Sequence, residues 1–134
     1  MKIEKFEDLI AWQEARKLVN LIYSVTQKSD FKDFGLANQI QKAAVSVMAN
    51  ISEGFGRFSF KDSKQFFTIA RGSIAELQSH LYVILDQTKI SKIEFDNIYE
   101  QSVKVNKLIN GLIRNTNFQL TGGLKNSRTH ELKN

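Results

Sequence analysis

The sequence predicts an all-α protein, an antiparallel up-down four-helix bundle, from three observations. Four segments repeat apolar residues every three or four positions, and none keeps the apolar–polar alternation of a strand. The chain contains no proline, which suits long helices because proline disrupts a helix interior. The polar connections between the segments are short, and short connections favour antiparallel neighbours.

The first two helices are expected at about residues 7–28 and 36–54, separated by the polar run KSDFKDFG. The apolar stripe of the first helix contains Trp12, Ala15, Val19 and Ile22. The inward residues of the second are Leu36, Ile40, Ala43, Val47 and Ile51.

The third and fourth helices are expected at about residues 60–87 and 92–117. Ser91 with Glu94 makes a capping box at the start of the fourth, and Ser59 with Asp62 a weaker start signal for the third. The third seam is Phe67, Ala70, Ile74, Leu77, Leu81 and Ile84. The fourth seam is Phe95, Ile98, Ser102, Val105, Ile109 and Leu112.

Residues 1–118 form one predicted domain, and residues 119–134 form a predicted flexible polar tail. The start MKIEKFEDLI lacks the apolar stretch of a secretory signal, and no apolar run approaches the roughly 20 residues of a membrane span. The chain has no cysteine, which fits a reducing compartment. We therefore expect a cytoplasmic protein without membrane contact.

The stretch VSVMANISEGFGRFSFKDSKQFF, residues 45–67, combines glycines with an arginine and lysines, as phosphate-binding loops do. It lacks both a GxGxxG pattern after a strand and a GxxxxGK(S/T) pattern. We interpret it as the corner between the second and third helices. Gly54 is expected to end a helix in the left-handed conformation, and Gly56 to let the chain reverse.

Two residues before this corner are unusual for a helix. Asn50 is a poor helix former, and Glu53 lies in a last turn, where the helix dipole disfavours negative charge. A structural polar cluster would explain both. Glu53 is expected to pair with Arg57, and Asn50 to tie the corner to a neighbouring helix or subunit.

The apolar residues exceed what a single bundle needs, which predicts a homo-oligomer. The first helix carries a second stripe, and phenylalanines gather at the corner. Gly72 in mid-helix favours close approach of another backbone. Phe58 and Phe60 are expected to be buried rather than free to stack on bases. The candidate interface residues are Ile10, Leu18, Leu21, Val25, Phe55 and Phe58.

Charge is distributed unevenly along the chain, whose net charge is +5. Residues 1–34 hold six basic and six acidic side chains, whereas residues 101–130 hold five basic ones and no acid. This pattern favours a polyanionic partner, RNA or DNA. The candidate binding residues are Lys61, Lys64, Arg71, Lys104, Lys107 and Arg114.

No constellation of catalytic or metal-ligating residues stands out. The two histidines, His80 and His130, are too few for a histidine metal cage, and HEL in the tail lacks the second histidine of a zinc protease motif. We therefore expect a non-enzymatic protein with no metal, cofactor or small-molecule substrate. The alternative to nucleic-acid binding is a protein-interaction scaffold that uses the apolar helix faces.

Four motifs resemble the family of 23S rRNA-intervening-sequence proteins, also called the S23 ribosomal protein family. They are FEDLIAWQEAR (6–16), AAVSVMANISEGFGR (43–57), GSIAEL (72–77) and LINGLI (108–113). The chain departs from the family pattern at Met48, where proline is usual; this would remove a helix kink and puts the local geometry of the corner in doubt.

The resemblance implies an antiparallel four-helix bundle, often assembled as a homopentamer around a central channel. The family is similar to the accessory variability protein of diversity-generating retroelements, a basic pentamer that binds nucleic acid and partners a reverse transcriptase. The word "ribosomal" records gene context, because genes of this family occur within insertions in 23S rRNA genes.

Overall fold

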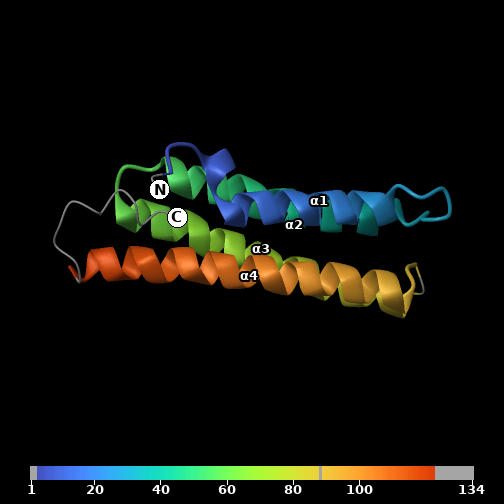
Figure 1. Ribbon diagram of the computed structural model, residues 1–134. Helices are drawn as coiled ribbons and strands as arrows, with labels where there is room; N and C mark the ends of the chain where they lie inside the picture. The colour runs from blue at the N-terminus through green and yellow to red at the C-terminus, as the bar shows by residue number, and fades with distance from the viewer. Residues whose placement is uncertain (1–2, 88, 123–134) are drawn as a thin grey trace.

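Four long helices make up most of the chain in the computed structural model, which describes residues 3–87 and 89–122. A 3-10 turn, η1 (Phe6–Asp8), precedes the helices, and no strand occurs among the described residues. This confirms the all-α class. The helices are α1 (Ile10–Thr26), α2 (Phe34–Gly56), α3 (Phe60–Asp86) and α4 (Lys92–Leu120), and Figure 1 shows them side by side.

The helix starts follow the capping residues of the sequence. Ser91 and Glu94 form the predicted capping box, in which the Ser91 hydroxyl accepts from the Glu94 N–H and the Glu94 carboxylate accepts from the Ser91 N–H. The Ser59 hydroxyl accepts from the N–H of Asp62 at the start of α3. Asp33 caps α2 without having been predicted to do so.

The core contains the predicted seams of α3 and α4, which are buried along their whole length. On α1 the prediction needs correction. Leu18 and Val25, expected on a stripe turned outward, are buried at 0% and 5% exposure, whereas Trp12 and Val19 are only partly buried. The reason is that α1 packs against both α2 and α4 and therefore buries a face wider than one stripe.

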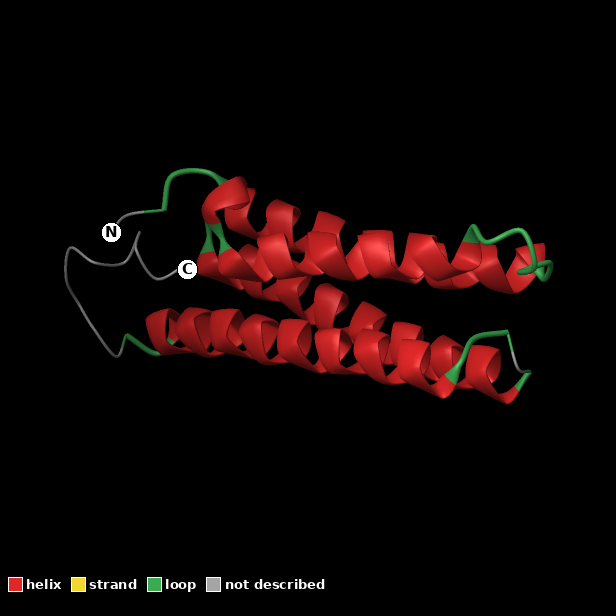
Figure 2. Cartoon of the chain, turned by 45° about the vertical axis from the view of Figure 1, so that its right-hand side comes forward, coloured by secondary structure: helices red, strands yellow, loops and turns green. Residues whose placement is uncertain are grey.

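The two ends of the helix layer carry different segments. The corner between α2 and α3 lies at the same end as the last turns of α4, and the α1–α2 and α3–α4 connections lie at the other end (Figure 2). α4 continues through Leu120, two residues into the predicted tail. Thr121 and Gly122 follow in a turn, and residues 123–134 of the tail lie outside the described residues.

None of the helices in the described part of the chain combines the length and apolarity that crossing a membrane requires.

Candidate functional site

A basic surface lies along α3 and α4. Gln78 of α3 donates to Ser102 of α4 at 3.0 Å, and Arg71 Nη1 donates to Asn110 Oδ1 at 3.3 Å. Positions earlier in α3 therefore lie beside positions later in α4. Lys64, seven residues before Arg71, is level with the last turns of α4. We call Lys64, Arg71, Lys107 and Arg114 the α3–α4 basic face.

This face is free of acidic residues on both of its helices. No aspartate or glutamate occurs within residues 63–75 of α3 or residues 101–120 of α4. Among the described residues, no ion pair involves Lys64, Lys107 or Arg114. Their charges are therefore available to a bound anion. Lys64 is partly buried, whereas Lys107 and Arg114 are exposed. Lys61, which is exposed and has no ion pair in this part of the chain, lies at the edge of the face next to Asp62.

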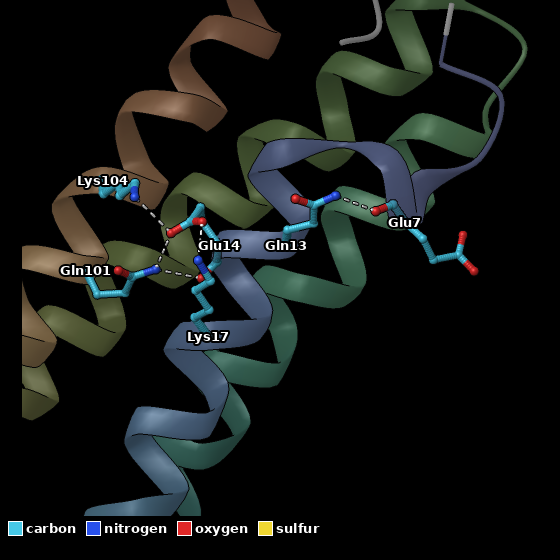
Figure 3. Close-up of polar contacts among 6 residues, drawn as sticks. All are labelled: Glu7, Gln13, Glu14, Lys17, Gln101 and Lys104. Carbon is cyan, nitrogen blue, oxygen red and sulfur yellow. Dashed lines mark hydrogen bonds and ion pairs between the residues drawn. The ribbon is translucent and has the colours of Figure 1, made fainter.

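Lys104, the sixth predicted binding residue, is placed differently. It faces α1, where its Nζ lies 3.1 Å from Oε1 of Glu14 (Figure 3). Lys17 approaches the other carboxylate oxygen at 2.9 Å, and Gln101 donates to both the side chain and the carbonyl of Glu14. The charge of Lys104 is thus compensated within the protein, which sets it apart from the basic face.

Glu14 is a buried carboxylate, with 6% of the residue exposed. The hydrogen bond from Gln101, reinforced by those from Lys17 and Lys104, lowers the pKa of Glu14 from 4.5 to about 2, and these contacts outweigh the opposing effect of burial. The residue is therefore ionised at neutral pH and links α1 to α4. This role was not predicted, although Glu14 interrupts the apolar series of Ala11, Leu18 and Ile22 at helical spacing.

The polar corner forms, but with different partners for Asn50. Arg57 Nη2 donates to Glu53 Oε2 at 2.9 Å, the predicted ion pair. Asn50 donates to the carbonyl and hydroxyl of Ser46 on its own helix. The link to α3 runs instead through Ser46, whose hydroxyl lies 2.8 Å from that of Ser73.

Gly54 does not end α2, which corrects the prediction of a left-handed helix end. The helix continues to Gly56, and the chain reverses only from Arg57 onward. Gly54 is buried, and a Cβ there would lie 2.4 Å from the ring of Phe67. Glycine is required because an aromatic ring from α3 packs directly on the α2 backbone. A Cβ on Gly56 would meet nothing within 4 Å.

Phe58 is fully exposed, at 104%, and not buried as expected, because it lies two residues beyond the end of α2, in the corner loop. It borders an open hollow of about 540 Å³ that Glu53, Arg57 and Asp62 also line. Phe60 is partly buried. Of the other candidate interface residues, Ile10 is exposed at 61%, Leu21 and Phe55 are partly buried against the core, and Leu18 and Val25 lie within it.

The sequence of the chain matches the model of a known protein family. The model of the 23S rRNA-intervening sequence protein family matches residues 7–111. The chain belongs to this family. Comparison with curated proteins gives no match.

A solved structure from the S23 ribosomal protein family has a similar fold. It is the crystal structure, at 1.70 Å resolution, of a protein with unknown function from Bacteroides thetaiotaomicron VPI-5482. Its TM-score is 0.68 at 25% sequence identity, and the match covers 78% of this chain and 94% of that one. In this 23S rRNA-intervening sequence family member, α2 runs unbroken through Met48.

The described residues include no group of three or more histidine, cysteine, aspartate or glutamate side chains that could hold a metal ion. Glu76 and His80, four residues apart on α3, approach each other at 3.7 Å.

The chemistry that the α3–α4 basic face best supports is electrostatic attraction of an anion along α3 and α4.

Proposed function

We propose that this family member is a non-enzymatic protein that binds RNA or DNA through the phosphate backbone, using the α3–α4 basic face. The observation that carries the proposal is the combination of Lys64, Arg71, Lys107 and Arg114 on two adjacent helix segments that contain no acid. Cations arranged in this way attract phosphate with little sequence preference.

The proposal predicts binding that depends steeply on salt, because each neutralised phosphate releases counterions. Fluorescence anisotropy with an RNA hairpin and a duplex DNA, each titrated at several salt concentrations, tests this. We expect log K to fall linearly with log salt, with a slope of about 0.9 for each phosphate contact on duplex DNA. Absence of binding at low salt would contradict the proposal. Tighter binding of the hairpin would identify RNA as the preferred partner.

We also propose that the helices form an up-down bundle and that the bundle assembles into a homo-oligomer, the homopentamer that the sequence resemblance implies. Side-chain pairs such as Lys28 with Glu94 and Glu14 with Gln101 support opposite directions for α1 and α4. The exposure of Ile10 and Phe58 supports self-association. Five copies, each with a charge of +5, would bring +25 together and strengthen the attraction of polyanions.

Light scattering coupled to gel filtration tests the assembly. We expect a mass several times the 15.4 kDa of one chain, and a lower mass for the double variant Ile10→Ser, Phe58→Ser. A monomeric wild-type protein would contradict the proposal of self-association.

A second candidate function is a protein-interaction scaffold, favoured by the fully exposed Phe58 beside the corner hollow. Large exposed aromatic residues are typical of protein interfaces. Binding through such a surface depends little on salt, so the titration that tests the first function also separates the two.

A further inference from the structure

One side of α4 combines two cations of the basic face with an exposed aromatic ring. Lys107, Gly111, Arg114 and Phe118 follow one another at intervals of four, three and four residues, which places them on the same side of the helix. We call these four residues the α4 row. The core side of the same helix contains Ile109, so the row faces away from the core.

In the middle of the row, the side chain of Arg114 lies close to Gly111. Arg114 Nη2 lies 3.7 Å from the position that a Cβ on Gly111 would occupy, so the guanidinium extends back along the helix over the glycine. Asn110, the residue directly before Gly111, accepts a hydrogen bond from Arg71 of α3. Two guanidinium groups therefore reach the same region of α4 from different helices, and each has N–H donors suited to phosphate oxygens.

The α4 row ends at Phe118, whose aromatic ring is only partly covered by packing within the chain. Phe118 is 41% exposed, and in the described part of the chain no other aromatic ring or cation stacks against it. It lies four residues beyond Arg114, about 6 Å along the helix axis. An aromatic ring one turn away from a cation can meet a base while the cation meets a phosphate.

We propose that the α4 row binds an unpaired nucleic-acid strand, with phosphates at Lys107 and Arg114 and a base stacked on Phe118. The inference rests on the proposed function, which it makes more specific. A duplex would offer phosphates to the two cations, but its base faces are stacked on one another and closed to Phe118. An unpaired strand supplies both contacts, since its bases can turn outward onto an aromatic ring.

The test compares three ligands of equal length: a single-stranded oligonucleotide, the same sequence as a duplex, and a single strand of abasic phosphodiester units. For the wild-type protein, we expect the base-bearing strand to bind at least about fivefold more tightly than the abasic strand, the low end for one stacked base. Phe118→Leu should remove this difference by weakening only the base-bearing strand. Phe118→Trp should preserve it.

Leucine keeps an apolar side chain at the position, so Phe118→Leu separates stacking from packing. Phe34→Leu is the matched control, because Phe34 is 76% exposed and lies at the start of α2, at the opposite end of the molecule (Figure 1). The control should leave all three affinities unchanged. Equal weakening of the base-bearing and abasic strands by Phe118→Leu, or no weakening, would overturn the inference. Salt-dependent binding of the abasic strand would still support the proposed phosphate contacts.

Discussion

Replacing Glu14 by glutamine tests whether its contacts join α1 to α4 energetically. The shift of the Glu14 pKa from 4.5 to about 2 corresponds to about 3 kcal/mol, at about 1.4 kcal/mol per pH unit. The ammonium groups of Lys17 and Lys104 belong to side chains that are 65% and 59% exposed, so water screens part of this energy. We expect Glu14→Gln to lower the free energy of unfolding by about 2 kcal/mol at pH 7.

The lowered pKa of Glu14 also sets the pH dependence of that loss. Because the folded-state pKa of Glu14 is lowered, its contribution is present above pH 4.5 and is lost as the pH falls toward 2. Urea unfolding followed by circular dichroism should therefore show a difference between wild type and Glu14→Gln that shrinks below about 1 kcal/mol at pH 3. Glu100→Gln, at an exposed position on α4, is the control and should have little effect. A loss that is equal at both pH values would refute the reasoning.

Two further predictions use matched pairs of variants. Gly54→Ala should destabilise the protein by about 1–3 kcal/mol, since its Cβ would collide with a buried ring, whereas Gly72→Ala, which meets nothing within 4 Å, should stabilise the chain by up to about 1 kcal/mol. Thermal unfolding of both variants checks the order, and a Gly54→Ala protein as stable as Gly72→Ala would contradict it. Lys104→Glu should lower the free energy of unfolding by about 1–2 kcal/mol, because it places a second carboxylate beside Glu14. Lys107→Glu should stay within about 0.5 kcal/mol of wild type in urea unfolding. Equal losses in the two variants would show that the contact between Lys104 and Glu14 contributes nothing to stability.

The helices could be predicted from the sequence because their signals are local. Apolar spacing placed the buried seams of α3 and α4, and Ser91 with Glu94 marked a helix start through contacts within one turn. The role of Gly54 could not be predicted in this way. Its neighbour, Phe67, belongs to another helix, and only the packing of α2 on α3 shows that a side chain at Gly54 would collide.

The candidate site was predictable in composition but not in arrangement. The sequence identified the acid-free basic stretch of α4, and the fold brings Arg71 of α3 beside it through Asn110. It could not separate Lys104 from Lys107, which lie three residues apart. That distinction depends on Glu14, 90 positions away from Lys104 in the chain, which compensates one lysine and leaves the other exposed.

The central claim, phosphate binding by the α3–α4 basic face, is tested most directly by the salt dependence of duplex DNA binding in a charge-reversal variant. The variant is Lys107→Glu with Arg114→Glu, and the matched control is Lys32→Glu with Lys42→Glu, which changes net charge equally at exposed positions outside α3 and α4. The account predicts weaker binding and a slope of log K against log salt that is shallower by about two for the first variant only. Equal effects of the two variants, or no effect of the first, would contradict it.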